Sequence, residues 1–274
     1  MINEFVKFLT VNKGYSIETA RAYRNDLQDF AKFAREQNPD AKWSTITQEE
    51  IEAYVAYMVN ELYARTTIKR KVSSIRSIYS WFRTRKMLDK NPARFVSTPK
   101  AGTREPKTVE VEAIRKVLND GQISLVTRME IAIIAETGVR ISELMAIRGI
   151  DIDEEHQQIH VIGKGNKERT VNYGHMTAQL LTLYKSDTAN RIFTETVEQA
   201  SRNIHFALKK YSAQQYLSPH ILRHTFATEM ARNGAQLQAI QQQLGHASAK
   251  TTEIYAHKSQ SGCTAQYLQF APVY

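Results

Sequence analysis

The sequence predicts a two-domain protein that is mainly α-helical, with an all-helical first domain and an α+β second domain. Apolar residues follow helical spacing through most of the first hundred positions. Residues 97–108, "STPKAGTREPKT", show no periodicity and contain two prolines and a glycine, which is typical of a linker. A β-hairpin pattern, "QQIHVIGKGNKERTVNY", follows later in the chain. We therefore expect a domain over residues 1–96, a linker over 97–108 and a second domain over 109–274.

Three helices are predicted in the first domain. The first carries the spacing Ala20, Tyr23, Leu27, Phe30 and Ala34. The second begins at "TQEE", a capping box in which Thr47 is the N-cap and the Glu50 side chain accepts a hydrogen bond from the Thr47 amide. The third runs from about Thr66 to Arg85.

The second domain is predicted to be mixed. Its hairpin has one strand that ends at Ile162, a Gly-Lys-Gly-Asn turn and a second strand that starts at Glu168. Gly138 is suited to end the apolar helix before it, because glycine readily takes the left-handed conformation. Helices are expected near 109–119, 123–136, 174–184, 196–211, 219–232, 236–243 and 248–256, with a short one at "ISELMAI".

The positive charge is concentrated in the first part of the chain. The net charge is +9, and residues 1–100 hold 18 Lys and Arg against 11 Asp and Glu. One edge of the third helix alternates cations with hydroxyls, which both donate hydrogen bonds to phosphate oxygens. A solvated face is the alternative, but such faces usually mix both signs of charge. The expected DNA contacts are Lys69, Arg70, Ser73, Arg76, Arg83 and, in the linker, Arg104.

A helix with an unusual face is predicted at "SPHILRHTFATEM", residues 218–230. Ser218 suits the N-cap and Pro219 the first helical position. His220, Arg223 and His224 then share one face of the helix. Taken alone, this face fits a phosphate site, half of a zinc site or a solvated basic surface.

Four segments together resemble the tyrosine recombinases, the phage-integrase and Xer-type family: "TGVRISEL" at 137–144, "GKGNKER" at 163–169, the segment 218–230 and "LGHASAKTTEIYAH" at 244–257. The resemblance covers the whole second region, and the helical, basic first region is similar to the core-binding domain of that family. It implies a catalytic set of Arg140, Lys164, His220, Arg223, His246 and Tyr255, with Glu143 as a supporting acid.

These residue types suit cleavage of a phosphodiester. Arg140 and Arg223 carry planar, permanently charged forks that match a phosphate. Tyr255 would be the nucleophile, and Lys164 would protonate the leaving 5′-oxygen. His220 is the candidate base and His246 a hydrogen-bond donor. The cations supply the charge stabilisation that a divalent ion would give, so we expect no metal and no cofactor.

The sequence thus predicts a site-specific DNA recombinase that forms a 3′-phosphotyrosyl intermediate. The resemblance implies duplex DNA as substrate, a homotetramer on two paired sites, and a C-terminal segment, about 258–274, exchanged between protomers. The alternatives are a non-catalytic, sequence-specific DNA-binding protein and a type IB topoisomerase. No apolar run is long enough for a membrane span. Cys263 is the single cysteine, which fits a cytoplasmic location.

Overall fold

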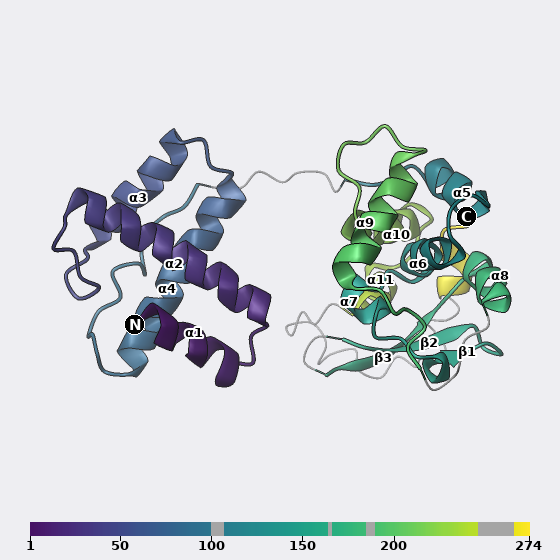
Figure 1. Cartoon of the computed structure of the whole chain (residues 1–274), viewed down its shortest axis with the longest axis horizontal. Helices are drawn as coiled ribbons and strands as arrows, with labels where there is room; N and C mark the ends of the chain where they lie inside the picture. The colour runs from purple at the N-terminus through teal and green to yellow at the C-terminus, as the bar shows by residue number, and fades with distance from the viewer. Residues whose placement is uncertain (100–106, 164–165, 185–189, 246–265) are drawn as a thin grey trace. The chain divides into compact units, whose positions relative to one another are not determined.

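In the computed structural model the chain divides into two units, Met1–Arg104 and Glu105–Tyr274, each with its own hydrophobic core (Figure 1). The structure describes residues 1–99, 107–163, 166–184, 190–245 and 266–274. The division falls inside the predicted linker, of which residues 100–106 lie outside the described ranges. The limits and roles predicted for the two domains stay predictions.

The first unit is all-helical, as predicted. Its helices are α1 (Ile2–Val11), α2 (Ile17–Gln37), α3 (Gln48–Asn60) and α4 (Arg65–Thr84). The capping box at Thr47 and Glu50 is present and starts α3. Leu27, Ile51 and Ile75 from three of these helices are fully buried in a shared core. This packing leaves one side of α4 exposed to solvent.

The second unit is built around α6 (Leu125–Thr137), a helix buried on nearly every side. Every residue from Met129 to Thr137 is buried, which confirms the apolar helix predicted there. Around α6 pack α5 (Val111–Asn119), α8 (His175–Leu183), α9 (Val197–Lys209) and α10 (Pro219–Arg232). The other described helices of this unit are α7 (Ile141–Leu144), η1 (Gly149–Asp151) and α11 (Leu237–Leu244).

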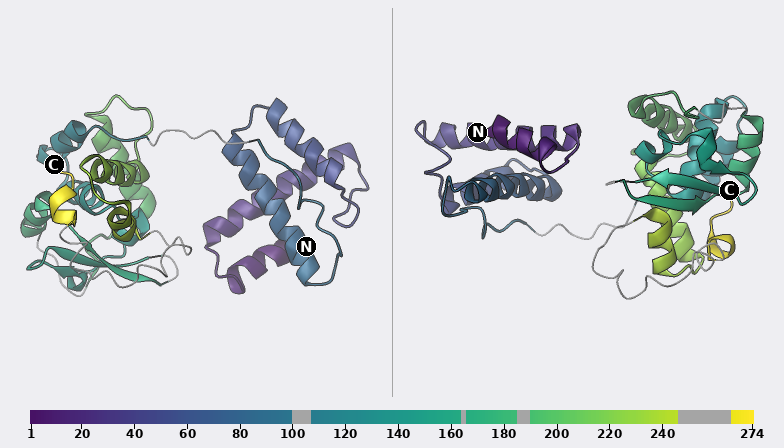
Figure 2. Two further views of the ribbon diagram at one scale, coloured as in Figure 1. Left: turned by 180° about the vertical axis from the view of Figure 1, so that it is seen from behind. Right: turned by 90° about the horizontal axis from the view of Figure 1, so that it is seen from below.

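A three-stranded antiparallel sheet lies along one edge of the second unit (Figures 1 and 2). Its strands are β1 (Ile152–Asp153), β2 (Gln158–Ile162) and β3 (Glu168–Asn172), in the order β1-β2-β3. In the β2–β3 hairpin His160 lies opposite Thr170 and Ile162 opposite Glu168. The predicted hairpin is confirmed, and β1 is an addition that the sequence pattern did not reveal.

The longer helices predicted within the described part of the second unit agree with the structure to within about two residues at each end, whereas the short helix expected over "ISELMAI" ends earlier, at Leu144. The helix at 219–232 matches α10, because Ser218 accepts a hydrogen bond from the Ile221 amide and Pro219 occupies the first turn. The helix expected at 248–256 lies outside the described residues.

The C-terminal residues 266–274 pack on their own unit. The Tyr267 hydroxyl donates to the carbonyl of Glu136 at 3.0 Å, and the Tyr274 hydroxyl to that of Ala135 at 3.2 Å. Tyr267 is buried against Phe226, Met230 and Leu244. The single chain therefore covers the end of α6 with its own tail, and exchange of this segment between protomers stays a prediction.

Candidate functional site

The end of α6 carries the first predicted catalytic arginine. Gly138 ends the helix in the left-handed conformation, with φ of +67°. A side chain there would collide with Phe226, because a Cβ would lie 2.5 Å from its ring. The chain turns at this glycine, and Arg140 then takes the N-cap position of α7. The turn thus places a cation at the start of a new helix.

Glu143 holds Arg140 by both its backbone and its side chain. The Arg140 amide donates to Glu143 Oε2 at 2.9 Å, and Arg140 Nη1 donates to Oε1 at 2.7 Å. The Glu143 side chain is only 3% exposed, whereas that of Arg140 is 37% exposed. Burial raises the pKa of Glu143, but hydrogen bonds from Arg169 and Arg140 outweigh it and lower the pKa below its ordinary value. A buried carboxylate therefore orients a cation that still faces solvent.

Arg223 on α10 is buried and joins two other segments. Its Nη1 donates to the carbonyl of Gly138, and its Nη2 donates to that of Leu244 at 2.8 Å. Burial, followed by the charge of Arg140, lowers the pKa of Arg223 to about 10, so the guanidinium stays charged at neutral pH. Arg223 thereby links the end of α6 to the end of α11.

His220 lies one turn before Arg223 and is exposed. Its ring packs edge-on against that of His224, with 4.3 Å between the centroids. Burial lowers the pKa of His220, and the charges of His224, Arg223 and Arg140 lower it further. A neutral imidazole is the form that can accept a proton. The structure therefore brings Arg140, Glu143, His220 and Arg223 together.

The other predicted site residues lie outside the described ranges: Lys164, His246, Tyr255 and, in the linker, Arg104. The residues next to two of them are described. The Gly163 amide, directly before Lys164 in sequence, donates to the carbonyl of Lys167 at 2.7 Å. Gly245 ends α11 with φ of +65°, directly before His246.

The predicted DNA-contacting face of α4 is exposed at Lys69, Arg70, Ser73 and Arg83. Arg70 also forms an ion pair with the buried Asp26 of α2. Arg76 differs, because it is half-buried and donates to the carbonyls of Ala93 and Val96. It thus fastens the segment that follows α4. Phosphate contact by this face stays a prediction.

Arg169 is a residue that the sequence interpretation did not single out. It lies on β3 with its side chain 14% exposed, and it forms a two-pronged pair with Glu143. A sequence signal did exist. Arg169 and Val171 are two residues apart and therefore point to the same face of the strand, and Val171 is in the core. A cation on a buried strand face requires a carboxylate partner.

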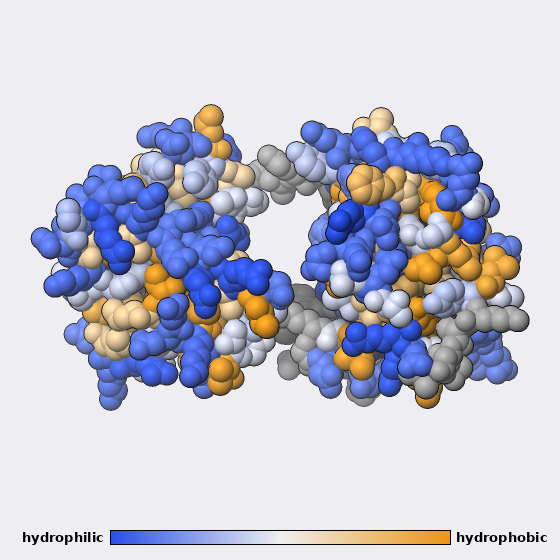
Figure 3. Space-filling view, in the orientation of Figure 1, coloured by the Kyte–Doolittle hydropathy of each residue, from blue (hydrophilic) through white to orange (hydrophobic). Residues whose placement is uncertain are grey.

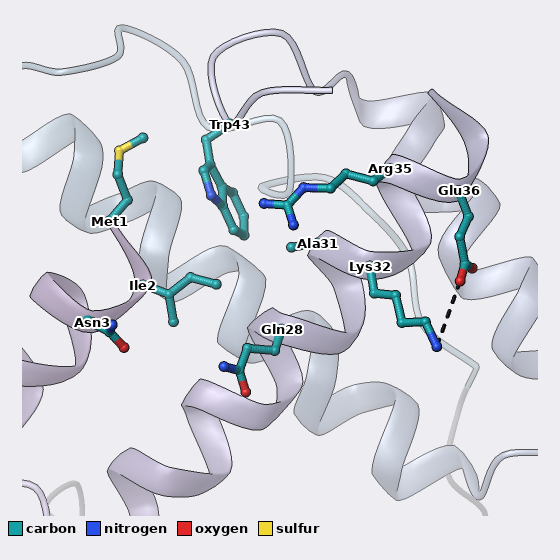
Figure 4. A pocket seen from close by; sticks show the side chains of 9 residues that line it. All are labelled: Met1, Ile2, Asn3, Gln28, Ala31, Lys32, Arg35, Glu36 and Trp43. Atoms are coloured by element: carbon teal, nitrogen blue, oxygen red, sulfur yellow. Dashed lines mark ion pairs between the residues drawn. The ribbon is translucent and has the colours of Figure 1, made fainter. Parts of the chain in front are cut away.

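No described helix is long and apolar enough to cross a membrane. Within the described residues, no three His, Cys, Asp or Glu side chains are grouped so that they could hold a metal ion. Hydrophilic residues dominate the face of each unit seen in Figure 3. A pocket of about 780 Å³ lies in the first unit, and its lining includes Trp43 and the ion pair between Lys32 and Glu36 (Figure 4). It contains none of the predicted site residues.

Comparison with known proteins gives matches along nearly the whole chain. Residues 107–261 match the profile of the phage integrase family, and residues 2–86 match the N-terminal SAM-like domain of phage integrases. Tyrosine recombinase XerC of Listeria welshimeri is 32% identical over 290 residues, which cover 98% of this chain and 96% of the relative. Tyrosine recombinase XerD of Halalkalibacterium halodurans is 29% identical, with 99% of this chain and 97% of the relative covered.

Solved structures share the fold. A lambda integrase dimer bound to a COC′ core site matches with a TM-score of 0.70 at 18% identity, covering 91% of this chain and 94% of that chain. The Tn1549 transposon integrase in complex with circular intermediate DNA matches with a TM-score of 0.65 at 19% identity, covering 97% and 98%. The helical first unit and the mixed second unit are thus a known combination.

Proposed function

We propose the reaction and the target of this chain from one established premise: it belongs to the phage integrase family of tyrosine recombinases. The resemblance carried by the four sequence motifs is thereby confirmed. The chain is a recombinase similar to XerC and XerD, and we propose that it acts at a specific DNA site through a covalent phosphotyrosine.

The proposed reaction conserves the energy of the phosphodiester bond. The Tyr255 oxygen attacks the scissile phosphorus, a bond forms between them, and the bond to the 5′-oxygen breaks. His220 takes the phenol proton, and Lys164 gives a proton to the leaving 5′-oxygen. A 5′-hydroxyl from the partner strand then attacks the 3′-phosphotyrosyl bond and releases Tyr255. Neither ATP nor a metal ion enters this scheme.

The observation that carries the proposal is the pair of fixed arginines at the end of α6. Negative charge builds on the non-bridging oxygens as the tyrosine attacks, and preorganised cations stabilise it without having to reorient. Arg140 is held by Glu143 and remains partly exposed. Among its contacts to described residues, Arg223 uses two of the five N–H donors of its guanidinium on backbone carbonyls, and we propose that other donors of the group bind the phosphate. His220 lies one turn away from Arg223 and is kept neutral by its surroundings.

The proposed substrate is duplex DNA, with four protomers on two paired sites. Two considerations support DNA as the partner. The exposed face of α4 presents Lys69, Arg70, Ser73 and Arg83. The two solved integrases described above are complexes, one bound to a COC′ core site and the other with circular intermediate DNA. The predicted linker with Arg104 would join the DNA-binding and catalytic domains. The proposal includes the domain limits, with a DNA-binding domain over 1–96, a linker over 97–108 and a catalytic domain over 109–274. It also includes a cytoplasmic location, where the protein meets the chromosome.

The test is covalent trapping on chromosomal DNA of the organism that encodes the chain. Denaturation with SDS should leave protein attached to defined fragments, and sequencing these fragments gives the target. Tyr255→Phe removes one oxygen and should abolish the adduct while DNA binding persists. Two plasmid copies of the trapped fragment should recombine.

Each alternative function has its own outcome in this test. A wild-type chain that binds DNA specifically without any adduct is a non-catalytic DNA-binding protein. One that relaxes supercoils on a plasmid without paired sites, and recombines nothing, acts as a topoisomerase. Adduct formation by Tyr255→Phe would place the nucleophile on another residue.

A further inference from the structure

Arg169 lies where several segments of the candidate catalytic site meet, although no step of the proposed reaction uses it. We propose that Arg169 is a positioning residue, which sets the placement of Glu143 and of the backbone on either side of the site at Gly163 and Gly245. The inference rests on the proposed function, because it concerns the residues that this function assigns to catalysis.

The first connection runs through Glu143. Arg169 Nη1 lies 3.2 Å from Glu143 Oε1, and Nη2 lies 2.8 Å from Oε2. The same carboxylate accepts the Arg140 amide and Arg140 Nη1. A two-pronged pair fixes the plane of the carboxylate as well as its position. The orientation of Arg140 therefore depends on a residue of the sheet.

The second connection runs through the end of α11. Arg169 Nε donates to the carbonyl of Gln243 at 3.2 Å. A Cβ built on Gly245 would lie 2.9 Å from Cζ, Nε and Nη1 of Arg169, so the backbone at Gly245 lies against the guanidinium. The next residue in sequence is His246. The carbonyl of Leu244, between these contacts, accepts Arg223 Nη2. Two arginines thus hold the last turn of α11.

The third connection runs through the hairpin turn. A Cβ built on Gly163 would lie 3.3 Å from Arg169 Nη1 and 3.2 Å from Glu143 Oε1. Lys164 follows Gly163 directly. One guanidinium therefore contacts the backbone beside two predicted catalytic residues and the carboxylate that holds a third.

Arginine is the side chain that this position requires. Its planar group donates in several fixed directions, whereas a lysine ammonium is a compact point charge on a flexible stem. Lysine would retain the charge but could not bind Glu143 with two prongs and the Gln243 carbonyl at the same time. Arg169→Lys is therefore the informative conservative variant, and Arg169→Ala the complete removal.

A matched control lies in the same unit. Arg148 also forms a two-pronged pair with a carboxylate, donating from Nη2 to Asp151 Oδ1 at 2.9 Å and from Nε to Oδ2 at 3.2 Å. Among the described residues, the side chain of Arg148 pairs with Asp151 and with none of the candidate site residues. Arg148→Ala therefore shows what the loss of such a pair does away from the site. Thermal melting accounts for the larger stability cost at Arg169, whose side chain is 14% exposed against 52% for Arg148.

The experiment measures single-turnover covalent cleavage of the trapped chromosomal fragment, nicked beside the scissile phosphate so that the adduct accumulates. Wild type, Arg169→Ala, Arg169→Lys and Arg148→Ala are compared, with DNA affinity and thermal melting recorded at each pH. We expect both Arg169 variants to cleave about 10- to 100-fold more slowly, the scale of a displacement of about 1 Å in a catalytic group. Their DNA affinity should stay near that of wild type, and Arg148→Ala should cleave at the wild-type rate.

The pH profile separates positioning from mere loss of stability. The charged groups that face Glu143 in the described part of the chain include Arg140 from α7, Arg169 from β3 and Arg223 from α10. Removal of Arg169 takes away the strongest interaction that lowers the pKa of Glu143, so that pKa rises relative to wild type. Glu143 is protonated at a higher pH in the variant, and cleavage by Arg169→Ala should fail at a higher pH than cleavage by wild type.

The outcomes are distinct. A slowed rate with an upward shift of the acid limb, while melting shows the variant folded at those pH values, supports the inference. Equal rates and equal acid limbs for wild type and Arg169→Lys overturn it, even if Arg169→Ala fails to fold. A wild-type chain that forms no adduct overturns the proposed function, and this inference with it.

Discussion

At the scale of single residues, the two arginines of the site differ in what surrounds them. Arg223 is 4% exposed and satisfies two backbone carbonyls, whereas the Arg140 side chain is 37% exposed and pairs with one carboxylate. A buried carbonyl left without a donor costs about 1–3 kcal/mol. The two residues should therefore share a catalytic role but contribute unequally to stability.

We predict that Arg140→Ala and Arg223→Ala each slow covalent cleavage by about 10²–10³, as expected for the loss of one donor to a developing negative charge. Arg223→Ala should in addition lower the free energy of unfolding by at least about 1–3 kcal/mol. Arg140→Ala should change it by less than about 1 kcal/mol, since Glu143 keeps Arg169. Denaturant unfolding and single-turnover cleavage measure the two effects. Equal stability of the two variants would contradict the structural role of Arg223.

The sequence suffices to name the candidate site residues, but not the contacts that hold them. Arg140 and Glu143 are three residues apart, so their pairing follows from the spacing alone. Arg169 meets Glu143 across 26 residues and the Gln243 carbonyl across 74. Local patterns contain no information on such separations, and only the packing of β3 against α7 and α11 produces them.

At the scale of elements, the best sequence predictions are those with a chemical signal at a terminus. Ser218 and Pro219 fix the start of α10, Thr47 and Glu50 that of α3, and Gly138 the end of α6. Strand β1 has two residues and no such signal, so the pattern did not reveal it. The α4 stripe is exposed at Lys69, Ser73 and Arg83. Arg76 is half-buried, and its attachment to the chain after α4 depends on tertiary contacts that a local pattern does not contain.

Helix α4 provides a test of how the first unit meets DNA. We predict that Lys69→Gln or Arg83→Gln weakens binding to specific and random DNA alike. Each should lower the slope of log affinity against log salt by about 0.9, because one phosphate contact is lost. The measurement is a fluorescence binding titration over a range of salt concentrations.

Two further variants complete the α4 experiment. Lys32→Gln on α2 is the matched control, because Lys32 is 79% exposed and pairs with Glu36; it should leave the slope unchanged. Arg76→Gln should also destabilise the unit, since it removes the donors to Ala93 and Val96. A changed site preference with an unchanged salt slope would indicate contacts to bases.

At the scale of the whole chain, the C-terminal tail packs against the end of α6, next to the candidate site. Tyr267 is 3% exposed and donates to the carbonyl of Glu136, two residues before Gly138. The side-chain carboxylate of Glu136 also accepts hydrogen bonds from the backbone amides of Gly174, Met176 and Thr177 at the start of α8. The last turn of α6 is therefore held between α8 and the tail.

We predict that Tyr267→Ala lowers the free energy of unfolding of the free protomer by about 3 kcal/mol, the scale for a large aromatic removed from a core. Leu268→Ala is the matched control, because Leu268 is 72% exposed and should change stability by less than about 0.5 kcal/mol. Denaturant unfolding at two protein concentrations measures both. A loss of stability that depends on protein concentration would show that the tail packs on a second protomer. An unchanged stability would show that Tyr267 does not pack against the end of α6.

Direct mapping of the covalent adduct tests whether this chain cuts DNA with Tyr255. The covalent complex with a short, nicked fragment of the trapped site is digested with trypsin and examined by mass spectrometry. We predict that the oligonucleotide is attached through its 3′-phosphate to the peptide "TTEIYAHK", residues 251–258, in which Tyr255 is the sole tyrosine. Attachment to any other peptide, or through a 5′-phosphate, would contradict a 3′-phosphotyrosyl link formed by Tyr255.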